Sequence, residues 1–176
     1  MVKLKGRVTN TKNMLFAALM ICMSNYSHAS YSPTQQLKQI GQGDMSWLFF
    51  DLYQASLYSD TGIYRDQDYP QALKIIYKRD INSADLVNVT EKEWQKLALD
   101  ADEYQYWLPA LSQLWPDIKE GDALVFLVGV DGLGAFYHNN QLLGGIDSDA
   151  FSKAFLSIWL STNTSEPILR RQLIGE

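Results

Sequence analysis

The spacing of apolar residues changes along the chain from strand-like to helix-like and back. Residues 45–58 carry aromatic and other apolar side chains on both faces, which predicts one long bent strand or two short ones. Residues 72–78 alternate more cleanly between apolar and polar positions and predict a half-buried strand. Within the first segment, alternation places Tyr53 on one face with a set of mostly apolar neighbours. These neighbours are Trp47, Phe49, Ala55 and Leu57.

Two helices are predicted in the middle of the chain. Apolar residues recur at helical spacing over residues 83–98, and Thr90 with Glu93 matches a capping box that would restart the helix. Residues 104–115 predict a second helix. In this helix Pro109 either causes a kink or occupies the first turn.

Three more strands follow the helical block. Residues 123–130, 133–138 and 141–146 are apolar segments separated by the turn pairs Asp131-Gly132 and Asn139-Asn140. Short turns of this kind join antiparallel neighbours. We therefore expect a meander at this point in the chain.

A helix opening at residues 147–149 completes the pattern. Its apolar stripe consists of Phe151, Ala154, Phe155, Ile158 and Trp159. Strands grouped around a helical block and a terminal helix predict the α+β class, with an antiparallel sheet and helices packed on one face. No repeat and no linker long enough to separate two domains interrupts residues 30–176, so a single domain is expected there.

The first 29 residues follow a different pattern. Four basic residues precede ten apolar residues at positions 14–23, and the small residues Ser27 and Ala29 follow. This order predicts a signal peptide over residues 1–29, and hence a periplasmic or secreted protein without a membrane anchor after cleavage. An uncleaved anchor is the alternative, but the apolar run is too short to cross a bilayer.

Charge and composition exclude several classes of function. Removing residues 1–29 takes away four of the 15 Lys and Arg and none of the 20 Asp and Glu, so the remainder has a formal charge of −9. Nucleic acid is therefore not an expected partner, because affinity for phosphates needs a basic surface. The single cysteine, Cys22, precedes the cleavage point, and His138 is the only histidine after it. We expect neither a metal site nor a cofactor.

The order and spacing of four segments resemble the bacterial, exported branch of the chalcone isomerase-like proteins. These segments are residues 41–58, residues 72–80, the pair Gly121-Asp122 and residues 154–160. The resemblance covers most of residues 34–174. It implies a chalcone isomerase-like open-faced β-sandwich, with a cleft between the sheet and the helices that cover one face.

The resemblance also implies where a ligand would be contacted. Plant enzymes of this family cyclise a chalcone with an arginine on the first strand pair and with threonine and tyrosine hydroxyls. No arginine occurs here between Gln35 and Arg65, so we expect no chalcone isomerase activity. The threonine position corresponds to Tyr53 and the shared tyrosine to Tyr58. Non-enzymatic plant relatives bind fatty acids through an arginine and a tyrosine, of which this chain would keep only the tyrosine.

Four residues are candidate ligand contacts, each with a structural alternative. Tyr53 either donates a hydrogen bond to a ligand or packs in the core with its hydroxyl at the edge. Arg79, next to Asp80, either anchors an anionic group at the mouth of the cleft or belongs to a solvated turn. Tyr58 matches the shared tyrosine of the family. Trp107 lines the cleft if the cleft is open and otherwise packs between helices.

Three functions remain open from the sequence. The first is non-catalytic binding of a hydrophobic or amphipathic small molecule, such as a fatty acid. The second is an intramolecular lyase or isomerase that acts on another substrate with tyrosine hydroxyls. The third is an envelope interaction protein whose cleft is filled by side chains. The first two require a cavity with a few convergent polar groups, whereas the third requires none. The oligomeric state is not determined.

Overall fold

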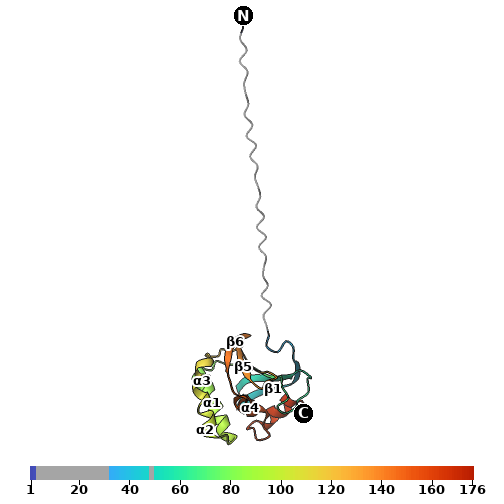
Figure 1. Ribbon diagram of the computed structural model, residues 1–176, viewed down its shortest axis with the longest axis vertical. Coiled ribbons are helices and arrows are strands. Elements are labelled where there is room, and N and C mark those ends of the chain that lie inside the picture. The colour runs from blue at the N-terminus through green and yellow to red at the C-terminus, as the bar shows by residue number, and fades with distance from the viewer. Residues whose placement is uncertain (3–31, 48–49) are drawn as a thin grey trace.

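The computed structural model describes residues 1–2, 32–47 and 50–176, and its centre is a six-stranded antiparallel sheet (Figure 1). Each strand pairs with the next one along the chain, in the order β1-β2-β3-β4-β5-β6. Helices pack on one face of this sheet, which confirms the predicted α+β class. The predicted signal peptide, apart from residues 1–2, lies outside the described residues.

The elements follow the predicted order, with two short helices more than expected. The strands are β1 (Lys38–Trp47), β2 (Phe50–Ser59), β3 (Gln71–Tyr77), β4 (Ala123–Val128), β5 (Gly134–His138) and β6 (Gln141–Ile146). The helices are α1 (Ser83–Lys96), α2 (Ala101–Tyr104), α3 (Trp107–Leu114), α4 (Asp149–Leu160) and α5 (Pro167–Ile174). Among these helices, all in the described part of the chain, none has the length and apolarity needed to span a membrane.

Residues 45–58 were predicted to form either one long bent strand or two short ones, and they belong to two strands, β1 and β2. In this hairpin Met45 lies opposite Tyr53, and Gly43 lies opposite Ala55. The hairpin begins earlier than expected, at Lys38. Residues 38–44 escape prediction as a strand because glutamine, glycine and aspartate are poor strand formers, so pairing with β2 rather than local preference makes them extended.

The helical predictions hold except for the restart at Thr90. The side chain of Asn82 caps α1 by accepting a 2.8 Å hydrogen bond from the Asp85 backbone N–H. The Thr90 hydroxyl donates to the carbonyl of Leu86 at 2.9 Å, within an unbroken helix. The capping-box interpretation is therefore wrong, because this hydroxyl is already used inside the helix. Pro109 lies in the first turn of α3, where its missing N–H costs nothing.

Aromatic rings fill one end of the space between sheet and helices. Phe126 of β4 packs against Phe136 of β5 and Phe155 of α4, with ring centroids 4.5 and 4.8 Å apart. On the helical side, the buried indole N–H of Trp94 donates to the carbonyl of Ala154 at 2.9 Å and joins α1 to α4. This end of the layer is closed, which leaves the opposite end, near β1 to β3, as the place for a cavity.

Helix α5 has no counterpart among the predicted elements. It begins with Pro167 and ends at Gly175, whose φ of 82° places it in the left-handed conformation common at helix ends. The helix packs against β1 through the buried Leu173. Gly41 allows this close approach, because a Cβ there would collide with the backbone carbonyl of Gln172.

Candidate ligand-binding pocket

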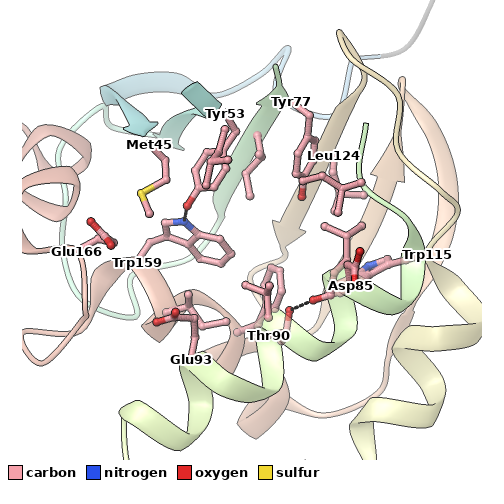
Figure 2. Close-up of a pocket in the computed structure, with 17 residues that line it drawn as sticks. Met45, Tyr53, Tyr77, Asp85, Thr90, Glu93, Trp115, Leu124, Trp159 and Glu166 are labelled. Carbon is pink, nitrogen blue, oxygen red and sulfur yellow. Dashed lines mark hydrogen bonds between the residues drawn. The ribbon is translucent and has the colours of Figure 1, made fainter. Parts of the chain in front are cut away.

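A pocket of about 170 Å³ lies between the covered face of the sheet and helices α1 and α4, with the start of α5 at one side (Figure 2). Its lining is mostly apolar, with a small number of hydroxyls and carboxylates. The lining residues are Met45, Leu52, Tyr53, Ile75, Tyr77, Ile81, Asp85, Leu86, Val89, Thr90, Glu93, Trp115, Leu124, Phe155, Ile158, Trp159 and Glu166.

One row of the sheet places two tyrosines in the wall. Met45, Tyr53 and Tyr77 are register partners across β1, β2 and β3, so their side chains point to the same face. The two phenol rings meet edge to face with centroids 6.1 Å apart. Figure 2 shows both hydroxyls turned into the pocket from the sheet.

The Tyr53 hydroxyl is held in place by a helix. It accepts a 2.9 Å hydrogen bond from the indole N–H of Trp159 on α4. Its own proton is free for another acceptor, because a phenol both donates and accepts. Tyr77 has only 5% of its surface exposed, and no hydrogen bond to its hydroxyl occurs within the described residues. The two phenols therefore differ: Tyr53 is fixed by a partner and Tyr77 is not.

Both phenols act as hydrogen-bond donors or acceptors rather than as bases. Burial raises the pKa of Tyr53 and of Tyr77 well above the usual range for tyrosine, since desolvation disfavours the phenolate. For Tyr53 the donated indole N–H acts in the opposite direction, and the carboxylates of Glu166 and Glu93 add to the rise. Both hydroxyls therefore keep their protons at neutral pH.

The indole N–H of Trp115 is a third polar group at the pocket. Trp115 is 5% exposed, and its Nε1 is a buried donor without a hydrogen-bond partner among the described residues. A buried N–H without a partner costs free energy, so such groups are uncommon. In Figure 2 the nitrogen-bearing edge of Trp115 faces the pocket interior on the side of Asp85.

Three carboxylates line the pocket, whereas no lysine or arginine is among its described lining residues. Asp85 accepts a 2.7 Å hydrogen bond from the amide of Asn82. Glu93 forms a 2.7 Å ion pair with Lys96. Glu166 is partly buried, and burial together with Glu93 raises its pKa above the usual range, an effect that Lys96 opposes.

Of the four candidate contacts predicted from the sequence, only Tyr53 lines this pocket. Tyr58 is five residues further along β2, so alternation places it on the uncovered face of the sheet. Arg79 is exposed, and its guanidinium lies 5.8 Å from the ring centroid of Phe50. Trp107 packs between Trp94 and other aromatic residues at the closed end of the layer. The structure does not bring these three together with Tyr53.

Only some of the predicted apolar neighbours of Tyr53 share its face of the strand. Ala55 and Leu57 share its face and are fully buried in the core. Trp47 is the last residue of β1, whereas Tyr53 is in β2. The alternation of side chains along a single strand therefore does not relate the two residues. Phe49 and the side chain of Trp47 lie outside the described residues.

Most polar residues of the lining were not predicted as ligand contacts, among them Tyr77, Trp115 and Glu166. For Tyr77 a signal existed, since alternation in residues 72–78 places it on the face of Leu73 and Ile75. Trp115 and Glu166 carried no such signal in the sequence. Trp115 ends a helical stripe that resembles ordinary packing, and Glu166 belongs to a helix that was not predicted.

A second hollow, of about 580 Å³, lies on the other side of α4. Its lining is more polar and includes Tyr64, Glu103, Lys153 and Arg170. The Arg170 guanidinium is partly committed, because it donates to the carbonyl of Leu160 at 2.8 Å. The first pocket is the better candidate, since ligand sites are mostly apolar with few convergent polar groups.

His138 is not the exposed turn residue that its sequence context suggests. Its Nε2 lies 2.9 Å from Oδ2 of Asp122, and both side chains are largely buried. The amide of Asn139 donates to the other oxygen of Asp122 at 2.7 Å. The arrangement ties β5 to the start of β4 and is separate from the pocket. Within the described residues, no group of histidine, cysteine, aspartate and glutamate side chains could hold a metal ion.

The sequence pattern of one known family extends over this fold. The model of the family described as chalcone isomerase-like matches residues 25–175. The chain belongs to the chalcone isomerase-like family. One relative is an uncharacterized protein of Haemophilus influenzae, which is 29% identical to this chain over 162 residues. The aligned region covers 92% of this chain and 77% of the relative.

Solved structures share the fold. The crystal structure of an Arabidopsis thaliana fatty-acid binding protein superposes with a TM-score of 0.65 over 80% of this chain and 88% of that chain, at 11% sequence identity. The superposition supports the chalcone isomerase-like fold. At this low sequence identity it says nothing about the ligand or the function of this chain. What the pocket of this chain accepts has to be argued from its own residues.

Proposed function

We propose that this chalcone isomerase-like protein binds a small hydrophobic or amphipathic molecule without transforming it. The observation that carries the proposal is a mostly apolar pocket into which the hydroxyls of Tyr53 and Tyr77 point. Apolar walls with a few placed polar groups are typical of small-molecule sites. The fatty-acid binding protein that shares the fold supports the same class of function.

The size of the pocket limits the guest. A volume of about 170 Å³ is below the range of roughly 300 to 1,000 Å³ usual for drug-sized ligands. A cavity of roughly 150 Å³ in another protein holds benzene. The enclosed part of the guest is therefore comparable with one aromatic ring or a short alkyl chain. Longer guests would extend past Val89, which is 53% exposed at the pocket.

Three observations favour binding over the alternative functions. An isomerase that used tyrosine as a base would need a lowered phenol pKa, whereas burial raises it for Tyr53 and Tyr77. An interaction protein with a filled cleft would have no pocket at this place. The arginine expected in chalcone-cyclising enzymes is also missing from the described lining.

Export is the second part of the proposal. The basic, apolar and small-residue order of positions 1–29 supports cleavage after Ala29 and a role in the periplasm or outside the cell. A binding protein in that location would receive its guest from the envelope or from the medium.

The test is to identify what the purified protein carries. The protein is isolated from its native host, extracted with organic solvent, and the extract is analysed by mass spectrometry. We expect a stoichiometric small molecule that is lost in Val89→Trp, where an indole blocks the pocket. The matched control is Val130→Trp, at a valine that is 84% exposed in a turn away from the pocket. A compound retained equally by both variants would contradict the proposed site.

A further inference from the structure

We propose that the pocket selects guests whose polar end is a protonated amine and rejects carboxylates. This inference rests on the proposed function and makes it more specific. It separates this chain from a fatty-acid binder, because the charge that the pocket presents has the wrong sign for a fatty acid.

The first argument is the charge of the lining. Asp85, Glu93 and Glu166 are at the pocket, and no lysine or arginine is among its described lining residues. A carboxylate guest would bring a fourth negative charge into a partly desolvated space, where like charges repel more strongly than in water. An ammonium group would meet opposite charges instead.

Glu166 is the carboxylate best placed to receive that ammonium. It occupies the N-cap of α5, but its side chain forms no capping hydrogen bond. Within the described residues it also has no ion pair, whereas Glu93 is paired with Lys96 and accepts a 2.6 Å hydrogen bond from Ser165. Glu166 thus has unused acceptor capacity. Burial, followed by the charge of Glu93, raises the pKa of Glu166, and Lys96 acts in the opposite direction.

The polar end of the guest would lie near Tyr53. Tyr53, Glu93 and Glu166 all line the pocket, and both carboxylates raise the pKa of the Tyr53 phenol. Figure 2 shows Glu166 and Glu93 on the side of Trp159, and Asp85 on the opposite side. An ammonium has three donors and no acceptor, which matches the carboxylate of Glu166 and the phenol oxygen of Tyr53, while Glu93 adds negative charge nearby.

A second observation, independent of the carboxylates, indicates that the pocket is built for a guest. Tyr77 is 5% exposed and its hydroxyl points into the pocket without a hydrogen-bond partner in the described chain. The Trp115 N–H is likewise buried and unpaired there. Both groups lie toward the end away from Glu166, where the face of an aromatic ring or a neutral oxygen would accept from them.

The experiment compares three guests that differ only in their polar end. They are 3-phenylpropylamine, 3-phenyl-1-propanol and 3-phenylpropanoate, titrated into the full chain at pH 7 by calorimetry. We expect the amine to bind at least about tenfold more tightly than the carboxylate, with the alcohol between them. Added salt should weaken the binding of the amine, because screening reduces attraction between charges.

Variants assign the selectivity to a residue. Glu166→Gln should lower the affinity for the amine about fivefold or more and leave the affinity for the alcohol unchanged. Glu103→Gln, which removes an acidic group from the second hollow, should change neither. If the carboxylate binds as tightly as the amine, or if Glu166→Gln leaves the ratio of amine to alcohol unchanged, the charge selection is wrong while the proposed function stands. If none of the three binds, the proposed function fails and this inference fails with it.

Discussion

The indole nitrogen of Trp159 donates a 2.9 Å hydrogen bond to the hydroxyl of Tyr53, across 106 residues of sequence. The bond connects α4 to β2 at the edge of the pocket, so the same contact stabilises the fold and orients a hydroxyl toward a guest. Packing alone would fix the ring but leave the hydroxyl hydrogen free to rotate about the C–O bond. Because the indole is the donor, the hydroxyl hydrogen of Tyr53 points away from Trp159. The open space next to this hydroxyl is the pocket.

Replacing Tyr53 by Phe should destabilise the protein by about 1 to 3 kcal/mol, because the Trp159 N–H would remain buried without an acceptor. It should also weaken guest binding, since one of the two hydroxyls is lost. Urea unfolding measures the first effect and calorimetry the second. Tyr58→Phe, on the uncovered face, is the matched control and should change the free energy of unfolding by less than about 0.5 kcal/mol. Unchanged guest affinity in Tyr53→Phe would make this phenol a structural residue only.

Truncating Trp159 to Ala should cost about 3 to 5 kcal/mol, because a side chain with only 8% of its surface exposed leaves a cavity between α4 and the sheet. Trp159→Phe keeps most of the packing and loses the N–H donor, so its cost should be smaller. The two variants separate packing from hydrogen bonding in one denaturation series. Equal stability of Trp159→Ala and the unaltered chain would place this side of α4 in solvent.

Substituting Gly41 by Ala should loosen α5 from β1. The added methyl group would collide with the carbonyl oxygens of Gln172 and Leu173, and backbone atoms cannot move aside as a flexible side chain would. We expect a loss of about 1 to 3 kcal/mol and faster hydrogen exchange in α5. Gly121→Ala is the control: its φ of 89° makes alanine costly, but no atom lies within 4 Å, so α5 should keep its protection. Slow exchange in α5 of Gly41→Ala would show that the helix adapts.

Stability should fall in acid between about pH 4 and pH 2 because of Asp122. The hydrogen bond from Asn139, the backbone N–H of Lys119 and the bond to His138 lower the pKa of this carboxyl to about 2. A carboxyl whose pKa is lowered by folding stabilises the protein above its unfolded pKa of about 3.9 and loses that effect as the pH falls through the folded pKa. After allowance for screening by solvent, this contribution is about 1 to 2 kcal/mol at neutral pH.

Asp122→Asn should therefore be less stable at pH 7 and should show a flatter stability profile between pH 4 and pH 2. Chemical denaturation at a series of pH values measures both effects. The exposed Asp60, replaced by Asn, serves as the control and should leave the profile unchanged. The same acid dependence in Asp122→Asn as in the unaltered chain would assign the transition to other carboxyl groups.

Export predicts a defined N-terminus. Intact-mass analysis of protein from the envelope fraction should give a chain that begins at Ser30. A full-length chain would show that the segment is retained, and a lipid-modified chain beginning at Cys22 would show anchoring instead of release.

Most of the local structure, and the kind of fold, could be predicted from the spacing of apolar residues. Alternation identified β3 and the meander from β4 to β6, and helical spacing identified α1 and the docking face of α4. These patterns are readable because each element buries one face, and burial imposes a period of two or about 3.6 on the apolar residues. Tyr53 was found in the same way, by its place on the covered face of a strand together with a family resemblance.

The set of side chains that share the pocket could not be predicted, because it depends on how distant elements pack together. Tyr77 of β3 is far from Trp159 and Glu166 in the sequence, and no local pattern indicates that these side chains converge. Helix α5 and the first half of β1 were missed for a related reason, because each depends on a partner elsewhere in the chain. The first half of β1 is held by pairing with β2, and α5 packs against β1 where Gly41 permits close approach. The charge of the pocket also follows from this convergence. A glutamate at a helix start carries no signal of its own, and the fold brings it to the pocket that Tyr53 lines, where the described lining contains no lysine or arginine.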